Sequence, residues 1–337
     1  MAGGGNGMKV LVTGAGGFLG AAISRQLIKQ GDDVVGLARG TYHEMEALGV
    51  SMFQGDITNI QDVKQASFGC DIVFHVAAKA GVWGKYNDYY KTNVTGTQNI
   101  IDACYENGIN HLVYTSTPSV VFTGEDENGI DESTPYAKKH LCHYTNTKAM
   151  AEKLVLSHNG DKLKTVALRP HLIWGPGDNH LVPRIIARGK AGKIKLIGSV
   201  DKLVDCLYID NAVLAHLAAA NCLKQGHYSC AGKAYFISND EPLLMKSLIN
   251  KILKCGQVAP VTKRVNGAVA FGVGGMLEML YGLLRIKQEP IMTRFVAKQL
   301  SCSHWFDISN AKNDLGYTPY VSIDEGMVKL EACLKDM

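Results

Sequence analysis

Residues 9–20 read KVLVTGAGGFLG: a short β-branched run, a glycine-rich turn and the first residues of an amphipathic segment. In this arrangement Gly14 permits a tight turn, Gly17 lets backbone N–H groups approach a pyrophosphate, and Gly20 lets a helix pack closely on the strand. The pyrophosphate then lies at a helix N-terminus, where unpaired N–H groups and the helix dipole favour an anion. The stretch therefore predicts a dinucleotide-binding strand–turn–helix unit, with Phe18 and Leu19 as further cofactor contacts.

Around this unit, the first half of the chain alternates between short apolar runs and longer helical stretches. The runs are KVLVTG (9–14), DVVGLA (33–38), SMFQGD (51–56), DIVFHVAA (71–78), HLVYTS (111–116) and TVALRP (165–170). Continuous apolar strands separated by helices are typical of a parallel sheet that is covered on both faces. We therefore expect an α/β fold with a Rossmann-type doubly wound parallel sheet.

The alternation loosens after Pro170, which indicates a second unit. We expect a cofactor-binding domain over residues 8–170 and a smaller mixed α/β substrate-binding lobe over residues 171–337. Two segments, 203–220 and 233–238, begin with strand-like runs that are expected to return to the first domain. The glycine-rich residues 1–7 lack the order of a signal peptide and are expected to form a flexible leader.

Composition excludes several classes of function. The chain has 337 residues and a net charge of +4, and its basic residues are dispersed, so no nucleic-acid surface is expected. Its nine cysteines are scattered without a C-x-x-C pair, a spacing that fits neither a zinc site nor a secreted disulfide framework. We expect reduced thiols, no metal and a cytoplasmic location.

The stretch from Val265 to Ile286 is apolar and rich in glycine, but Asn266, Glu278 and Arg285 interrupt it. A spanning helix needs about 20 clean apolar residues, so we expect no transmembrane segment. The stretch predicts either a buried helix or a lip that touches lipid or an apolar substrate. A peripheral contact with a membrane stays open.

The end of the second strand decides which nicotinamide cofactor fits. An NAD site usually places a carboxylate there for the ribose 2′-hydroxyl, whereas NADP needs a cation for the 2′-phosphate. The strand here ends in Leu37-Ala38-Arg39-Gly40, without a carboxylate, and Arg39 can form a forked contact with a phosphate. NADPH is therefore the expected cofactor; the alternative is a solvated surface arginine.

Further cofactor contacts are expected where the next strands end. Asp56 could accept the adenine amino group or cap its own loop, and small side chains keep the loop after the fourth strand open. Asn93 could cap or brace the cofactor side of the sheet. With the neighbours that we assign to the same side, this set is Asp56, Ile57, Ala77, Ala78, Asn93, Lys148 and Pro170.

Tyr144 and Lys148 lie four residues apart in a helix-compatible stretch, so they share one helix face. A nearby ammonium lowers the pKa of a phenol below its free value of about 10, which suits proton exchange near neutral pH. We expect Tyr144 to give its proton to a substrate oxygen and Lys148 also to hold a ribose hydroxyl. Thr117, with Ser116 as second choice, could donate to that oxygen or could simply cap a turn.

With these groups in place, the chain resembles the extended short-chain dehydrogenases/reductases, and within them the 3β-hydroxysteroid dehydrogenase branch. The matching pieces span residues 8 to 216 and read VTGAGGFLG, DIVFHVAA, NVTGTQNII, YTSTPSVVF, YTNTKAMAEK, RPHLIWGPGD and YIDNAVLAH. One departure is the threonine at position 117, where much of the wider family has serine. The resemblance implies an NADP-dependent oxidoreductase that acts on an alcohol or ketone.

Nearly the whole chain resembles a bacterial branch of NADPH-dependent reductases that act on 2-alkyl-3-oxoalkanoic acids in long-chain olefin biosynthesis. The stretches that carry this resemblance include AAKAGVWGKYNDYYKTNVTGT, LRPHLIWGPGDNHLVPRI and GKAYFISNDEP. It implies a long-chain β-keto acid as substrate and the β-hydroxy acid as product. It also implies association with a thiolase-like condensing enzyme, a β-lactone synthetase and a β-lactone decarboxylase, and a homodimer is common in the family.

Substrate contacts and rival functions stay open from the residues alone. A cation for the carboxylate could come from Lys79, Lys85, Arg184 or Arg294, and pocket walls from Trp83, Trp174, Trp305 and His304, although each has an ordinary structural alternative. The rivals are a sterol-4α-carboxylate 3-dehydrogenase or other 3β-hydroxysteroid dehydrogenase, a nucleotide-sugar epimerase or reductase, and a non-enzymatic NADP-binding redox sensor. The apolar stretch 265–286 fits a uridine-binding lobe poorly, and redox sensors usually lose the tyrosine–lysine pair.

Overall fold

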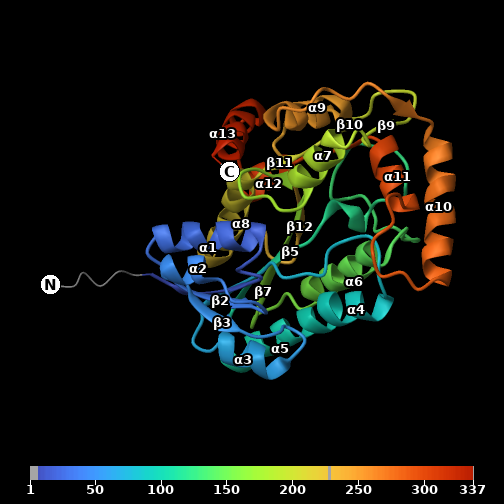
Figure 1. Ribbon diagram of the computed structural model, residues 1–337. Helices are drawn as coiled ribbons and strands as arrows, with labels where there is room; N and C mark the ends of the chain where they lie inside the picture. Colours follow the sequence, from blue (N-terminus) through green and yellow to red (C-terminus); the bar gives the residue numbers. More distant parts are fainter. Residues whose placement is uncertain (1–6, 227–228, 337) are drawn as a thin grey trace.

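The computed structural model describes residues 7–226 and 229–336, so the expected leader lies almost wholly outside the described residues. Its centre is a seven-stranded sheet in the order β12-β7-β5-β4-β1-β2-β3, in which all neighbouring strands are parallel (Figure 1). The strands are β1 (Lys9–Thr13), β2 (Asp33–Ala38), β3 (Ser51–Gln54), β4 (Ile72–His75), β5 (His111–Thr115), β7 (Lys164–Pro170) and β12 (Ala234–Ile237). The expected doubly wound sheet is confirmed, and 233–238 does supply its edge strand.

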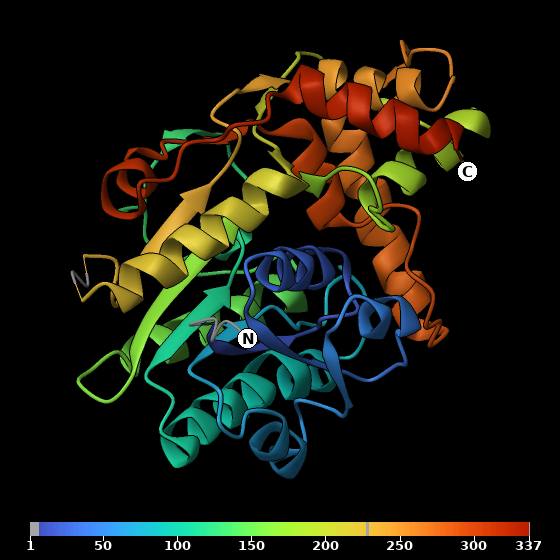
Figure 2. The same ribbon diagram turned by 90° about the vertical axis from the view of Figure 1, so that its left-hand side faces the viewer.

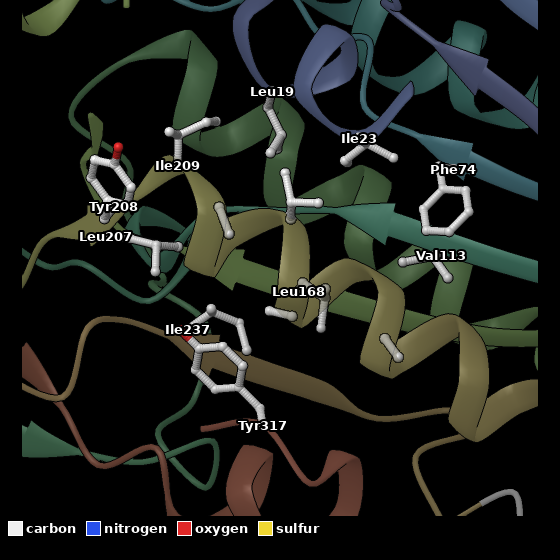
Figure 3. Packing of buried hydrophobic residues seen from close by; sticks show 14 of the residues in the cluster. Leu19, Ile23, Phe74, Val113, Leu168, Leu207, Tyr208, Ile209, Ile237 and Tyr317 are labelled. Atoms are coloured by element: carbon white, nitrogen blue, oxygen red, sulfur yellow. The ribbon is translucent and has the colours of Figure 1, made fainter. Parts of the chain in front are cut away.

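Helices cover both faces because alternate residues of each strand point to opposite sides. Val10 and Val12 of β1 pack with α1 (Phe18–Lys29) and α8 (Ile209–Lys224), as Figure 3 shows for neighbouring strands. Leu11, between them, packs on the other face. That face is covered by α3 (Ile60–Ala66), α5 (Gly96–Asn107) and α6 (His143–Ser157).

Short helical elements complete the first domain where its strands end. α2 (His43–Ala47) follows β2, and α4 (Tyr86–Tyr90) continues through a π-helical turn (Lys91–Thr95) into α5. A 3₁₀ turn (Pro118–Val120) follows β5. These connections lie at the carboxyl ends of β2, β4 and β5, the edge where open α/β sheets bind ligands.

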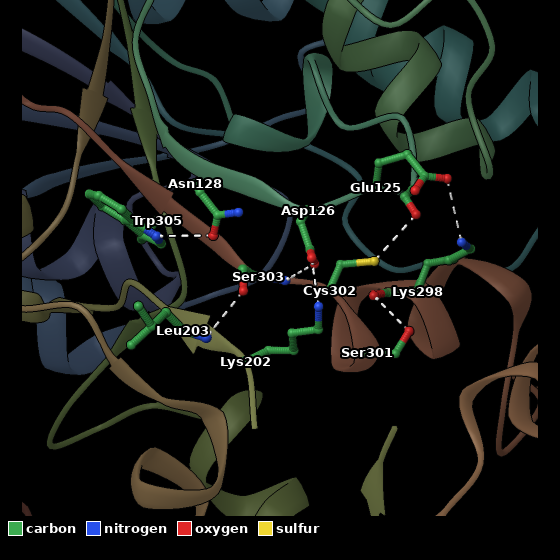
Figure 4. Close-up of polar contacts among 11 residues, drawn as sticks. Glu125, Asp126, Asn128, Lys202, Leu203, Lys298, Ser301, Cys302, Ser303 and Trp305 are labelled. Atoms are coloured by element: carbon green, nitrogen blue, oxygen red, sulfur yellow. Dashed lines mark hydrogen bonds and ion pairs between the residues drawn. The ribbon is translucent and has the colours of Figure 1, made fainter. Parts of the chain in front are cut away.

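The second lobe is built on three small sheets. One has the order β13-β10-β15-β6, from Leu243–Leu244, Leu203–Val204, His304–Phe306 and Glu127–Ile130. The other two pair β11 (Leu207–Tyr208) with β8 (Ile173–Trp174), and β14 (Arg264–Val265) with β9 (Leu196–Ile197). Side chains between these strands form polar contacts, such as the ion pair of Lys202 with Asp126 at 2.6 Å (Figure 4).

One strand expectation is therefore wrong: residues 203–208 do not return to the main sheet. The backbone of this segment is tied to the second lobe instead, because Asp205 is buried, accepts the Phe306 amide at 2.8 Å and donates its own amide to His304. Only the helix that follows, α8, packs on the main sheet, where it lies beside α1 (Figure 2).

The remaining helices are α7 (Leu181–Lys190), α9 (Met245–Cys255), α10 (Gly267–Leu283), α11 (Arg294–Ser301), α12 (Ser309–Leu315) and α13 (Ile323–Lys335). Across the described ranges, none of the helices is long and apolar enough to span a bilayer. All nine cysteines are free thiols.

Candidate active site

A cleft of about 870 Å³ opens along the carboxyl ends of β1 to β5. Most residues that the sequence assigned to a cofactor line it: Gly14, Gly17, Phe18, Leu19, Gly20, Arg39, Asp56, Ile57, Ala77, Ala78 and Lys148. Asn93 and Pro170 do not. Pro170 is buried in the sheet opposite Ile237, so the structure does not bring it to the cleft.

The glycine turn has the geometry that a pyrophosphate needs. Gly14 has a φ of +70°, which a side chain disfavours, and its carbonyl accepts the Gly17 amide at 2.8 Å. A Cβ on Gly20 would lie 2.2 Å from the Gly14 oxygen, so only glycine allows α1 to start this close to β1. Tyr42 packs its ring against Gly16 and also lines the cleft. Tyr42 could not be predicted as a cleft residue from the sequence, since nothing in its spacing marks it.

A directed chain of buried hydrogen bonds supports the turn and the loop after β4. Thr13 Oγ1 accepts the amides of Val76 and Ala77 at 3.1 and 3.0 Å, so its proton points to His75 Nδ1 at 2.9 Å. His75 Nε2 then donates to Thr97 at 2.9 Å. Burial lowers the pKa of His75 to about 3, so the ring is neutral and the direction of the chain is fixed.

Asn93 braces the same loop from behind the cleft. Its Oδ1 accepts the Lys79 amide at 2.7 Å, and its Nδ2 donates to Thr147 Oγ1 at 3.0 Å. Thr147 precedes Lys148 on α6, so the amide joins the loop after β4 to the helix that carries Lys148. Bracing, one of the two roles left open from the sequence, is the one with direct contacts.

Arg39 and Asp56 lie where β2 and β3 end. The Arg39 side chain is exposed, and no carboxylate within residues 7–226 and 229–336 forms an ion pair with it. Asp56 accepts the Thr58 amide at 2.9 Å, so it caps its own loop while it also lines the cleft. The free guanidinium is available for an anionic group at the β2 end of the cleft.

Tyr144 lies in the first turn of α6 and Lys148 one turn later, and both line the cleft. Lys148 is almost fully buried: its Nζ donates to the Thr115 carbonyl at 2.6 Å and lies 4.2 Å from the centre of the Tyr114 ring. Thr117, which caps the 3₁₀ turn after β5, is close enough to the phenol of Tyr144 to lower its pKa. Helix α6 thus presents Tyr144 and Lys148 to the cleft, and Thr117 comes from the segment after β5.

The electrostatic expectation for Tyr144 is wrong for this structure. Burial raises the pKa of Tyr144 to about 12, and the hydrogen bond from Thr117 only partly opposes this rise. Lys148 does not lower the pKa of the phenol, because burial lowers the pKa of the lysine itself to about 7 and its Nζ is bound to Thr115. Tyr144 is therefore protonated at neutral pH.

Ser116, the second choice for the oxygen contact, also lines the cleft. Its Oγ is buried and has no hydrogen-bond partner among the described residues. Thr117, in contrast, forms a 2.8 Å hydrogen bond with the Ser119 hydroxyl and caps the following 3₁₀ turn. Of the two roles that the sequence left open for Thr117, the turn cap is present in the structure, and donation to a substrate oxygen stays a prediction.

Most expected substrate contacts have structural partners. Arg184 pairs with Glu289 at 2.7 Å and Arg294 with Glu278 at 2.6 Å, whereas Lys79 lies over the Tyr89 ring. Lys85 is exposed. Two of the aromatic candidates are core residues: Trp174 is fully buried, and His304 is buried between His171, at 2.7 Å, and the Gln299 carbonyl. Trp305 donates to Asn128 at 3.3 Å.

An apolar cluster includes Cys142, a residue close to Tyr144 in the sequence. It joins Phe122 and Phe295 with Val82, Leu141 and Cys142. Cys142 precedes Tyr144 by two residues and is the N-cap of α6. The second lobe therefore contributes an apolar side chain, Phe295 of α11, to the cluster that contains this N-cap residue.

The glycine turn, the tyrosine–lysine pair and the two-lobed fold together define an extended short-chain dehydrogenase/reductase. The model of the 3-beta hydroxysteroid dehydrogenase/isomerase family matches residues 11–261, and the chain belongs to this family. It is thus an oxidoreductase of the nicotinamide-dependent kind.

Two bacterial relatives of the chain carry the same enzyme name. The chain is 60% identical to a 2-alkyl-3-oxoalkanoate reductase of Shewanella oneidensis over 96% of its own length and 85% of the relative's. It is 47% identical to a 2-alkyl-3-oxoalkanoate reductase of Stenotrophomonas maltophilia, over 96% and 99%. Among solved structures, a UDP-glucuronic acid 4-epimerase of Bacillus cereus in complex with UDP-glucuronic acid and NAD has a TM-score of 0.75 at 24% identity, over 98% and 99% of the two chains. That likeness concerns the fold alone.

Proposed function

We propose that the protein uses NADPH to reduce 2-alkyl-3-oxoalkanoic acids to 2-alkyl-3-hydroxyalkanoic acids. The observation that carries this proposal is the 60% identity to a reductase of that name over nearly the whole chain. The cleft supports it, because Tyr144 and Lys148 line it together with a glycine turn suited to a dinucleotide.

The cleft residues fit an NADP cofactor. The turn from Gly14 to Gly20 would hold the pyrophosphate at the N-terminus of α1, and Lys148 would hold a ribose hydroxyl. Arg39, exposed and without an acidic partner in the described chain, would bind the 2′-phosphate. When bound, the reduced nicotinamide supplies the hydride.

Tyr144 acts as the general acid in the direction of reduction. Its raised pKa of about 12 keeps the phenol protonated at neutral pH, so it can donate to the substrate oxygen as negative charge develops there. The hydrogen bond from Thr117 stabilises the phenolate that is left. Ser116, whose hydroxyl lines the cleft without a partner among the described residues, would steady the substrate oxygen.

The apolar cluster of Val82, Phe122, Leu141, Cys142 and Phe295 would wall the site for an alkyl arm of the substrate. An apolar wall of this kind suits a β-keto acid with long alkyl chains and suits a polar sugar nucleotide poorly. A role in olefin biosynthesis, a cytoplasmic location, a homodimer, and association with a β-lactone synthetase and a β-lactone decarboxylase belong to the same proposal.

The test measures NADPH consumption with a synthetic 2-alkyl-3-oxoalkanoic acid, and the reverse reaction with the 2-alkyl-3-hydroxy acid. We expect turnover with the acyclic acids and little with a 4α-carboxysterol. Turnover of the sterol at a similar or higher rate would assign the site to sterol oxidation and overturn the proposal.

A further inference from the structure

Helix α10 leaves an uninterrupted apolar face uncovered. Its exposed residues include no Asp, Glu, Lys or Arg. Seven of them share one face of the helix, because they are spaced as helical turns require: Val269, Gly272, Val273, Met276, Met279, Leu280 and Leu283. Seventeen residues at 1.5 Å per residue make this face about 25 Å long. Contiguous exposed apolar surface of this kind marks an interaction site.

The opposite face of α10 is fixed to the protein, so the exposed face cannot simply turn inward. Gly274 lets the chain at Thr293 approach closely, because a Cβ there would lie 2.6 Å from its carbonyl carbon. Glu278, the charged residue of α10, accepts the Arg294 amide at 2.8 Å and pairs with its guanidinium. Figure 1 shows α10 at the outer edge of the second lobe with α11 on its inner side.

Basic residues stand at both ends of the apolar face. Lys263 precedes α10, and Arg285 and Lys287 follow it; all three are exposed. No carboxylate in the part of the chain that the structure describes forms an ion pair with them. Arg264, by contrast, is neutralised by Asp201.

We propose that this face of α10 docks on the surface of a bilayer that contains anionic phospholipids. Apolar side chains on one helix face, with cations at its ends, match acyl chains and phosphate groups respectively. A second copy of the chain fits less well, because any two-fold pairing of α10 places basic ends against basic ends. An acidic protein partner would find the cations but no polar group along the 25 Å between them.

The docked helix adjoins the cleft. Trp83 Nε1 donates to the carbonyl of Ile286, just beyond α10, at 3.0 Å, and the Trp83 ring packs against Tyr281. Trp83 belongs to the loop after β4, which lines the cleft through Ala77, Ala78 and Ala80. A bilayer held by α10 therefore lies beside the loop that borders the cofactor cleft.

The test is flotation of the full-length protein with vesicles, without cofactor or substrate, so its outcome is independent of the proposed reaction. The vesicles contain either phosphatidylcholine alone or phosphatidylcholine with phosphatidylglycerol. The double variant Met279→Gln/Leu283→Gln should lower the partition coefficient at least about tenfold on the anionic vesicles. The double variant Lys263→Gln/Lys287→Gln should lower it roughly tenfold on the anionic vesicles and leave binding to neutral vesicles unchanged.

A matched control uses apolar residues that are equally exposed elsewhere. Met279 and Leu283 are 72% and 79% exposed, and Phe68 and Val328 are 72% and 69% exposed. Phe68→Gln/Val328→Gln should bind vesicles like the parent. The inference is overturned if the parent does not float with anionic vesicles, if the control loses as much binding as the α10 variant, or if the α10 variant instead converts an oligomer to a monomer in light scattering.

Discussion

Replacing Lys148 with methionine should stabilise the cofactor-free protein while it abolishes turnover. The side chain is 2% exposed, and burial lowers the pKa of its ammonium from the ordinary 10.5 to about 7. This pKa difference means that the charged ammonium, relative to the neutral amine, is about 5 kcal/mol less stable in the folded protein than in the unfolded chain. The lost hydrogen bond to the Thr115 carbonyl offsets about 2 to 3 kcal/mol of this, because the donor is charged. Methionine fills a similar volume, so a net gain of about 2 kcal/mol remains.

The gain should depend on pH in a defined direction. Between pH 7 and 10.5 the unfolded chain keeps a proton on Lys148 that the folded chain has released, so the parent becomes more stable as the pH rises. From pH 7 to 9 this recovers about 2 kcal/mol, so the advantage of Lys148→Met should vanish near pH 9.

Urea unfolding at pH 7 and pH 9 measures both effects, and a thermal shift of about 3 °C should accompany the gain at pH 7. Lys153→Met, an exposed change on the same helix, is the control and should alter the free energy of unfolding by less than about 0.5 kcal/mol. The reasoning would be refuted if Lys148→Met were less stable than the parent at pH 7. It would also be refuted if the variant gained the same free energy of unfolding at pH 7 and at pH 9.

Three further changes test other parts of the structure. Arg169→Met should cost about 3 to 5 kcal/mol of unfolding free energy, because it leaves the fully buried Glu152 carboxylate without the cation that contacts it at 2.6 Å; urea unfolding measures this loss. Gly20→Ala should weaken NADPH binding at least about tenfold, measured by fluorescence titration, because its Cβ meets the Gly14 oxygen. Arg39→Ala should weaken NADPH binding about tenfold or more and leave NADH binding nearly unchanged, measured by the same titration.

Each of these has its own control. Lys251→Met removes an exposed ion pair with Asp324 and should change the free energy of unfolding by less than about 1 kcal/mol, so a loss as large as that of Arg169→Met would contradict the role of burial. Gly160→Ala replaces a glycine that has open space around it and no positive φ, outside the cleft lining, and should not change NADPH binding. Equal weakening of NADH and NADPH by Arg39→Ala would remove Arg39 from recognition of the 2′-phosphate.

The features that the sequence predicted well are local ones. The strand runs and the glycine turn are set by residues close in the chain, and Tyr144 and Lys148 share a helix face whatever surrounds them. These patterns were sufficient for the sheet, for most of the cleft lining and for the pair on α6. The parallel pairing of the seven strands then brings their carboxyl ends to one edge of the sheet.

The features that it missed depend on contacts between distant residues. The series of hydrogen bonds from Thr13 through His75 to Thr97 joins residues that are 62 and 22 positions apart, so no short stretch of the sequence predicts it. The pKa of Tyr144 was expected to fall because the neighbouring ammonium is visible in the sequence, whereas the burial that raises it is not. The apolar pattern of residues 203–208 predicts a strand of the main sheet, but the hydrogen bond between Asp205 and Phe306 holds them in the second lobe.

The most direct test of the account follows a labelled hydrogen. A 2-alkyl-3-hydroxyalkanoic acid carrying deuterium at C3 is incubated with NADP⁺, and the reduced cofactor is analysed by mass spectrometry. We expect deuterium in the cofactor with the parent protein, and a rate lowered by at least about a hundredfold in Tyr144→Phe with NADPH binding retained. An unlabelled cofactor, or a Tyr144→Phe protein that works at the parent rate, would contradict this expectation.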